Sequence, residues 1–220
     1  MIQAWQTRLL NNKPFVTKEY KAVGSYTDTL GVGDYLITVI GGGGGGVGAW
    51  GRSGGTFDWG QGGVGGTLQV KVSISKATQI NVVVGAGGRT STQSYQGVVS
   101  GWGGTDGVDS YITGIPNVTL RAGAGTAASF VPTSISGGTR TLGKQGTNTI
   151  SGVKEIVANN TNKINAQGGA FSTTTTRAAT GLANTNWPEN TLFGAGGDAG
   201  YTTMIQSRTG GSGYVLIETI

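Results

Sequence analysis

The chain has 220 residues, of which 44 are glycine, whereas an average protein is about 7% glycine. There is no Gly-X-Y repeat and only four prolines, which excludes collagen and a proline-rich disordered chain. The net charge of +5 arises mostly in the first 21 residues, where Arg8, Lys13, Lys18 and Lys21 accompany Glu19 alone, and no basic stripe interleaved with aromatics follows. We therefore expect no nucleic-acid binding. The absence of Cys and His excludes disulfides, histidine-based catalysis and structural zinc sites.

The N-terminal part differs from the rest in charge and pattern. Residues 1–12 could form one or two amphipathic helical turns, while residues 15–23 and 26–30 are typical of strands. We predict an N-terminal attachment segment over residues 1–30 and a glycine-rich β domain over residues 31–220. No apolar run approaches the roughly 18 residues of a membrane span, and no hydrophobic leader is present, so we expect no membrane insertion.

The organising stretch begins with an apolar strand at 35–40 that ends at six consecutive glycines, 41–46. Two pieces with alternating apolar and polar residues follow at 68–74 and 80–84, and the stretch closes on the glycine cluster 85–88. Oligoglycine loses much backbone entropy on ordering, so it stays disordered unless it is packed. Without Cβ atoms, extended helices with three residues per turn can pack directly against one another. We predict packed glycine helices here, with ordinary tight loops as the alternative.

Glycine clusters and short strands recur along the remaining chain. Strands are predicted at 111–113, 117–120, 149–153, 155–157 and 214–218. Pro116 is predicted to impose an extended or edge conformation between two of them. Further glycine clusters lie at 97–107, 122–125, 168–169, 194–197 and 210–213. We predict an all-β fold, an antiparallel sheet or a jelly-roll-like sandwich, with packed polyglycine II helices and long Gly/Ser/Thr-rich loops.

Two glycine motifs resemble nucleotide-binding loops, but their surroundings do not fit. Residues 46–51 spell G-x-G-x-x-G after a strand, yet no helix follows and Lys71 stands where an acidic residue is needed. Residues 138–144 (GTRTLGK) nearly spell a P-loop, but Gln145 replaces the hydroxyl residue that would hold magnesium. Neither motif predicts nucleotide binding.

Acidic residues are few, and only Asp106 and Asp109 lie close together in sequence. A calcium site needs more oxygen ligands than this loop offers, so turn formation is the preferred interpretation. A pair of acids brought together in space for glycoside hydrolysis is left open, although nothing local supports it. We predict a protein that is not an enzyme, with no catalytic residues, no cofactor and no metal.

The remaining candidates are aromatic residues between the glycine clusters. Trp102, Phe193 and Tyr201, close to glycine pairs, are predicted to cap the glycine layer. A second set has small polar neighbours, a composition that provides rigid contact area and adaptable hydrogen bonds in binding sites, or else it too covers the glycine layer. The candidate receptor-binding residues are Trp50, Phe57, Trp59, Tyr95 and Trp187.

Three motifs carry a family resemblance: YLITVIGGGGGGVGAWG (35–51), GGTLQVKVSISKATQINVVVGAGG (65–88) and GGSGYVLIETI (210–220). Together they resemble the glycine-rich domain at the tips of bacteriophage tail fibres and, more distantly, the glycine-rich domain of anaplastic lymphoma kinase receptors. The resemblance implies a β-scaffold carrying polyglycine II helices, with variable loops between them that bind a receptor, protein or glycan, on the bacterial outer surface.

The implied loops are 47–61, 89–96, 126–135 and 171–193. The resemblance also implies a tail-fibre tip adhesin on the virion that acts extracellularly and is joined through its N-terminal segment to a tail fibre or tail protein. It leaves the oligomeric state open, a trimer included. A structural virion or surface component with no receptor-binding role is the main alternative. A polysaccharide- or ice-binding module, suggested by Thr173–Thr176, is the other.

Overall fold

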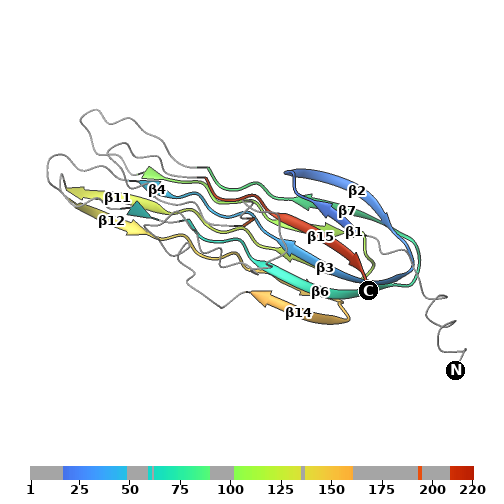
Figure 1. Ribbon diagram of the computed structural model, residues 1–220. Helices are drawn as coiled ribbons and strands as arrows, with labels where there is room; N and C mark the ends of the chain where they lie inside the picture. The colour runs from blue at the N-terminus through green and yellow to red at the C-terminus, as the bar shows by residue number, and fades with distance from the viewer. Residues whose placement is uncertain are drawn as a thin grey trace, which may run out of the picture.

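The computed structural model describes residues 17–48, 59–60, 62–89, 102–134, 137–160, 193–194 and 209–220. The molecule is elongated, with a β-sandwich at one end and glycine-rich segments that run on from its strands toward the other end (Figure 1). Within the described part there is no α-helix, and every pair of strands is antiparallel. The predicted all-β fold is confirmed.

Sheet A is built around the two strongest predicted strands and the C-terminal strand. Its order is β1 (Thr17–Tyr20), β15 (Tyr214–Thr219), β3 (Gly33–Ile40), β6 (Thr67–Ile74) and β14 (Glu155–Asn160). Buried and partly or fully exposed positions alternate along most of β6, as its alternating sequence predicts. The last strand of the chain therefore lies inside the sheet, between the first strand and the third.

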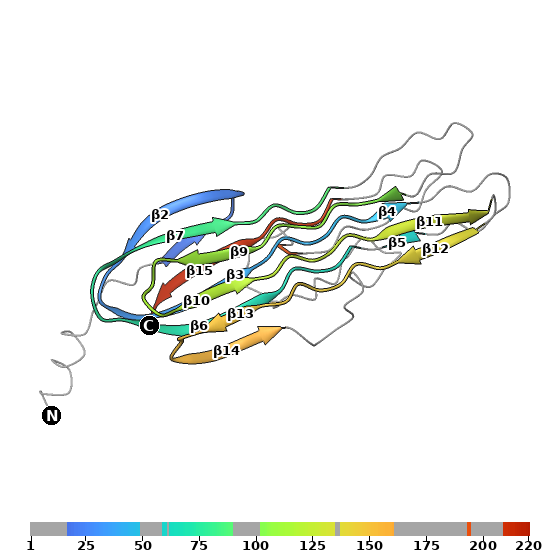
Figure 2. The ribbon, with the colours of Figure 1, turned by 180° about the vertical axis from the view of Figure 1, so that it is seen from behind.

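Sheet B forms the second layer of the sandwich. Its order is β13 (Thr149–Ser151), β10 (Thr119–Ala122), β9 (Ser110–Thr113), β7 (Thr78–Val84) and β2 (Gly24–Leu30). Figure 2 shows β7, β9, β10 and β13 side by side from behind. The described residues of the predicted attachment segment thus give one strand to each sheet, β1 and β2, and the attachment role of that segment remains a prediction.

The turn between β9 and β10 differs from the predicted extended conformation at Pro116. Ile115 accepts a hydrogen bond of 3.2 Å from the Val118 amide, and Asn117 has a φ of 59°. Proline at the second position and a positive φ at the third define a type II turn. Because Asn tolerates the left-handed region, the Pro-Asn pair reverses the chain and pairs the two strands as a hairpin.

The core lies between the two sheets and is made by the inward-facing residues of both. Fully burying such an aliphatic side chain contributes roughly 1.5–3 kcal/mol. The largest fully buried side chains are Leu30, Ile37, Leu68, Ile80, Leu120, Ile217, Val39, Val70, Val72, Val82 and Val84. The sandwich is therefore an ordinary hydrophobic fold, stabilised by its side chains.

Two small sheets lie at the end of the molecule away from the sandwich (Figures 1 and 2). One pairs β4 (Val47–Gly48) with β5 (Trp59–Gly60), and the other has the order β12 (Gly137–Thr141), β11 (Ser129–Ser134), β8 (Trp102–Gly103). The sequence predicts no strand at β11 or β12 and a loop over 126–135, because the Gly, Ser, Thr and Pro residues there show no alternating pattern. The loop prediction is wrong for residues 129–134, which form β11. β11 and β12 pair across a register shift at Pro132, where a bulge accommodates a residue that cannot donate a backbone hydrogen bond.

Candidate functional site: the glycine bundle and its distal end

The strands of the sandwich continue into a bundle of extended glycine-rich segments. We name each segment after the sandwich strand to which it is joined, and call the one that continues β3 the central tract. The bundle comprises the central tract (41–46) and the β6 (62–66), β7 (85–89), β9 (104–109), β10 (123–128), β13 (142–148) and β15 (209–213) segments. The distal end is the end of this bundle farthest from the sandwich.

The N–H groups of the central tract point to three neighbours in turn. Gly41 and Gly44 donate to the β6 segment at N···O distances of 2.9 and 2.8 Å. Gly42 and Gly45 both donate to the β9 segment at 3.0 Å, and Gly43 donates to the β15 segment at 2.9 Å. A direction that repeats every third residue is the signature of a helix with three residues per turn.

The carbonyl oxygens of the central tract follow the same period. Those of Gly42 and Gly45 accept hydrogen bonds from the β10 segment at 2.8 and 3.0 Å, and that of Gly43 accepts one from the β7 segment at 2.7 Å. The tract thus bonds to five surrounding segments through its backbone alone. Its residues are all buried, so these bonds satisfy groups that water cannot reach.

The surrounding segments also bond to one another and close a ring. Around the central tract the order is the β6, β10, β9, β7 and β15 segments, and Gly194 closes the gap. The Gly194 carbonyl accepts from Gly65 at 2.7 Å, while its N–H donates to the Ser212 carbonyl at 2.7 Å. One tract surrounded by five hydrogen-bonded segments and Gly194, with bond directions that repeat every third residue, is the arrangement expected for packed polyglycine II helices, and it confirms that part of the fold prediction.

The packing leaves no room for a side chain at the inward positions. A Cβ atom at Gly44 would lie 2.0 Å from the Thr126 carbonyl oxygen, and one at Gly45 would lie 2.0 Å from the Arg89 carbonyl oxygen. Because both obstacles are backbone atoms of hydrogen-bonded neighbours, they cannot move aside as a side chain could. Only glycine fits at these two positions, because the neighbouring backbone lies too close to leave room for a Cβ atom.

The β13 segment is not predicted from the sequence, where part of it resembles a P-loop. It lies outside the ring and bonds to the β10 segment through Lys144 and to the β6 segment through Gly146. Gly143 and Gly146 are the positions where a Cβ would meet neighbouring backbone, at 2.0 and 1.9 Å. Their spacing of three, which also occurs at Gly104 and Gly107, is the signal that could have identified the segment.

Two carboxylates, considered above as calcium ligands, instead bond to the β10 segment. Asp106 accepts a hydrogen bond of 2.6 Å from the Ala127 amide, and Asp109 accepts one of 2.6 Å from the Ala124 amide. The two acids are three residues apart, and so are the two amides, so the spacing matches the three-residue period of the helices. The carboxylates accept hydrogen bonds from backbone N–H groups at the outside of the bundle. No group of three or more metal-ligating side chains occurs among the residues that the structure describes.

The described residues on either side of three stretches of chain lie at the distal end. Residues 49–58 are flanked by β4 and β5, residues 135–136 by β11 and β12, and residues 90–101 by the β7 segment and β8. The two small sheets that carry these flanks are in contact, because β11 touches both β4 and β5. In Figure 1, β4, β11 and β12 lie at the opposite end of the molecule from the C-terminus. The fold thus collects the flanks of three separate stretches at one place.

The five predicted receptor-binding aromatics fall mostly outside the described residues. This is so for Trp50, Phe57, Tyr95 and Trp187. Trp59 lies in β5, where its backbone pairs with Gly48, and its side chain is not among the described features. The role of all five stays a prediction.

Among the predicted capping residues, Phe193 is described and is only 8% exposed. Its ring stacks on Tyr214 with a centroid separation of 4.6 Å, and both pack with Ile40. This small cluster lies where β3 gives way to the central tract, so Phe193 covers the junction between the sandwich and the bundle. The side chains of Trp102 and Tyr201 lie outside the described residues.

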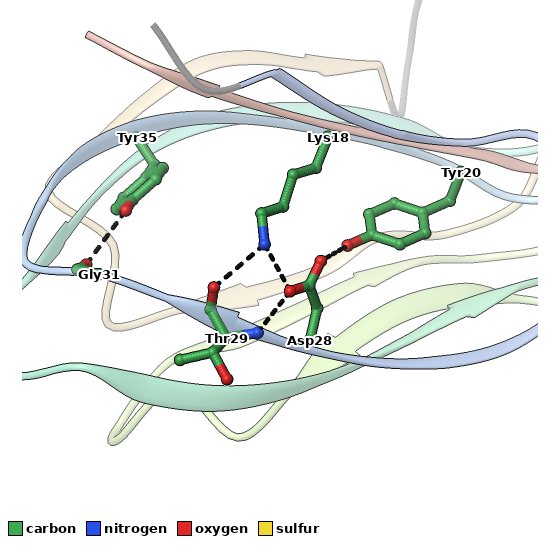
Figure 3. Close-up of polar contacts among 6 residues, drawn as sticks. All are labelled: Lys18, Tyr20, Asp28, Thr29, Gly31 and Tyr35. Atoms are coloured by element: carbon green, nitrogen blue, oxygen red, sulfur yellow. Dashed lines mark hydrogen bonds and ion pairs between the residues drawn. The ribbon is translucent and has the colours of Figure 1, made fainter. Parts of the chain in front are cut away.

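A polar cluster joins the edge strands β1 and β2 at the other end of the molecule (Figure 3). Lys18 forms an ion pair with Asp28 and donates to the Thr29 carbonyl oxygen at 3.1 Å, while the Tyr20 hydroxyl donates to Asp28 at 2.7 Å. Burial alone would raise the pKa of Asp28, but hydrogen bonds from Lys18, Tyr20 and the Thr29 amide outweigh it and lower that pKa. Burial and the neighbouring carboxylate raise the pKa of Tyr20.

The opposite face of β1 carries a second carboxylate–tyrosine pair. The Tyr214 hydroxyl donates to Glu19 at 2.6 Å, and Lys21 forms an ion pair with Glu19 at 2.8 Å. Burial would raise the pKa of Glu19, but the hydrogen bonds from Lys21 and Tyr214 and the Lys21 charge lower it overall. Burial and the Glu19 carboxylate raise the pKa of Tyr214. These groups link the first strand to its neighbours.

The chain matches no protein-family model, and a search of curated proteins finds no similar sequence. The fold and the site define an all-β protein in which a sandwich carries a polyglycine II bundle. No helix long and apolar enough to cross a membrane is found in the part of the chain that the structure describes.

Proposed function

We propose that this protein is a bacteriophage tail-fibre tip adhesin that binds a receptor on the outer surface of the host bacterium and has no enzymatic activity. The observation that carries the proposal is the convergence at the distal end of the flanks of 49–58, 90–101 and 135–136. A rod built from backbone hydrogen bonds holds them away from the sandwich. Such an arrangement suits a protein that must present variable loops at a distance from its attachment point.

Composition and family resemblance support the same proposal. Residues 49–58 and 90–101 contain Trp50, Phe57 and Tyr95 among Gly, Ser, Thr and Gln, the composition of adaptable recognition loops. The glycine motifs resemble those of tail-fibre tips. The distal side chains would make the receptor contacts, and the glycine bundle would only hold their positions.

The N-terminal segment would make the connection to a tail fibre or tail protein. β1 begins at Thr17, and the opposite end of the molecule from the distal loops holds β1, β2 and the C-terminus. Attachment through residues preceding β1 would therefore leave the distal end pointing outward from the particle. Deleting residues 1–16 should prevent incorporation into phage particles while leaving the binding of the isolated protein to cells unchanged.

Cell binding by loop variants tests the receptor-binding role. The fluorescently labelled full chain would be incubated with a panel of bacterial isolates, and binding measured by flow cytometry. In a strain that binds the chain, the combined change Trp50→Ser, Phe57→Ser and Tyr95→Ser should weaken binding at least tenfold, since aromatic anchors carry most of the energy of such interfaces.

Val108→Thr is the matched control, because Val108 is exposed on the side of the bundle, away from the distal end. It should bind like the unmodified chain. If exchanging residues 49–58, 90–101, 135–136 and 171–192, which lie outside the described strands and bundle segments, leaves the range of bound strains unchanged while circular dichroism shows a native fold, the adhesin proposal is wrong. A structural virion component would then be the better account.

A further inference from the structure

The C-terminal strand occupies an unusual place in the fold. β15 lies inside sheet A, with β1 on one side and β3 on the other. Among the strands that the structure describes, β1 pairs with β15 alone, from Thr17 opposite Glu218 to Tyr20 opposite Val215. The first strand of the domain is thus held in its sheet by the last.

The β15 segment completes the bundle in the same way. Gly210 and Gly213 donate hydrogen bonds of 2.8 Å to the carbonyl oxygens of Gly88 and Gly85, and the Gly211 carbonyl accepts one of 2.9 Å from Gly43. Without residues 209–213, the ring around the central tract is open and these groups lose their partners. One continuous run of the chain therefore closes both the sheet and the bundle.

The contacts of β15 span far more sequence than those between the other strands. The bond from Tyr214 to Glu19 joins residues 195 positions apart, whereas the ladder of β6 and β14 joins Lys71 and Glu155, 84 positions apart. Long-range pairings require the closure of long loops and tend to form late in folding. All of sheet B and the β3–β6–β14 part of sheet A can pair without residues 209–220.

The side-chain contacts of β1 with β2 do not replace the missing ladder. The Lys18–Asp28 ion pair is partly exposed, and such pairs stabilise a fold weakly. Tyr20 adds one hydrogen bond of 2.7 Å to Asp28, a ring contact with Tyr26 at a centroid separation of 5.1 Å, and partly buried packing against the core. Ordering a four-residue strand costs backbone entropy at every residue, which a few weak contacts cannot offset. β1 is therefore expected to be unprotected until its hydrogen-bonding partner arrives.

We propose that residues 209–220 act as a closing latch: they dock last in folding, and β1 enters the fold only together with them. Until then β3 is an edge strand with an unpaired row of backbone groups. The latch removes this edge from solvent, and with it a template for pairing with other chains.

Pulse-labelling hydrogen exchange during refolding of the unmodified full chain tests the order of docking. The protein would be diluted from denaturant, pulsed with deuterium at increasing times, and digested for mass spectrometry. Peptides covering β2, β6, β7 and β9 should become protected first, and those covering β1 and β15 should become protected later and at one common rate. Protection of β1 together with β2 and before β15, or protection of all strands in a single phase, would overturn the proposal.

A matched pair of substitutions provides the second measurement. Val215 in β15 and Val82 in β7 are both 0% exposed, so Val215→Ala and Val82→Ala remove the same buried atoms from a late and an early strand. Val215→Ala should leave the early phase unchanged and accelerate native-state exchange of the β1 amides roughly tenfold, from the loss of about two buried methylene equivalents. Val82→Ala should slow the early phase instead. If Val215→Ala slows the early phase as much as Val82→Ala does, residues 209–220 belong to the folding nucleus and the latch is refuted.

Discussion

The sandwich and the glycine bundle are made by the same strands but are held together by different parts of the chain. In the sandwich, Ile37 and Val39 of β3 are completely buried among side chains from both sheets. A few residues later, Gly41 to Gly45 have no side chains and contact their neighbours through backbone hydrogen bonds. One strand can thus pass from a hydrophobic core into a core of peptide groups when its sequence changes from β-branched residues to glycine.

The two regions should therefore fail in opposite ways. A core of side chains is damaged when atoms are removed, because cavities form. A core of backbone is damaged when atoms are added, because the segments already touch. Substitutions that add or remove a few carbon atoms can distinguish these mechanisms.

Adding one methyl group in the bundle should have the largest effect. In Gly44→Ala, the new Cβ would lie 2.0 Å from the Thr126 carbonyl oxygen and 2.3 Å from its carbon. We expect a loss of about 4 kcal/mol or more in the free energy of unfolding, at the exceptional end for single substitutions. Urea unfolding followed by circular dichroism measures it, with the soluble fraction recorded if the variant does not fold.

Gly31→Ala is the control for this change. The nearest atom to a Cβ at Gly31 is the Tyr35 hydroxyl oxygen at 3.8 Å, an ordinary contact. This variant should be close to neutral, since alanine also reduces the entropy of the unfolded chain. If the two variants are equally stable, the bundle is not packed as tightly as described.

Removing atoms from the sandwich should have the next largest effect. Ile80→Ala empties a site that is 0% exposed and should cost about 3 kcal/mol through lost burial and the cavity. Ile156→Ala in β14 removes the same atoms from a residue that is 51% exposed and should cost less than about 0.5 kcal/mol. Similar losses in both variants would contradict the assignment of Ile80 to the core.

Acid should act first on the end of the molecule that carries β1 and β2. The pKa values of Asp28 and Glu19 are lowered in the fold, so the stability they contribute is fully present above their unfolded values of about 4. It is lost as the pH falls from about 4 through the lower folded values. Because both side chains are partly exposed, Asp28→Asn should cost only about 1 kcal/mol at pH 7.

Native-state hydrogen exchange at pH 6 and pH 3 measures this effect strand by strand. Amides of β1 should lose more protection at pH 3 than amides of the central tract. Asp28→Asn should reduce the difference between the two pH values. Equal losses at both ends of the molecule would show that these carboxylates are not the groups responsible.

The smallest effect is expected at the outward positions of the bundle. Val108 is 51% exposed although its carbonyl oxygen accepts a hydrogen bond from Gly42, so Val108→Thr keeps every backbone contact and should change stability by less than about 0.5 kcal/mol. The adjacent Gly107→Ala would place a Cβ 2.4 Å from the Gly42 carbonyl oxygen and should be strongly destabilising. Thermal unfolding of the pair compares an outward with an inward position one residue apart.

The sequence predicted the sandwich well because its strands carry a side-chain pattern. Alternation in 68–74 and 80–84 reflects burial of one face, and the structure places β6 and β7 there. The packed glycine helices were also predicted from the run at 41–46. Their number and neighbours were not, because glycine has no side chain to indicate which face is buried or what it touches.

The candidate site was predictable only as a composition. Aromatic and small polar residues between glycine clusters indicate display, but only the structure brings the flanks of 49–58, 90–101 and 135–136 to one end. The β13 segment shows what a better sequence rule would be: glycines three residues apart, as at Gly143 and Gly146, mark one buried side of a three-residue helix.

The threefold repeat of the central tract also limits how proteins of this design can vary in length. Deleting one glycine would rotate every later N–H group by about 120° and direct it to a different neighbour. Adding three would advance the tract by one turn, about 9 Å, and restore each direction. Because each segment bonds to several others, all of them must gain the turn together, so natural length variants should differ by multiples of three residues in every segment at once.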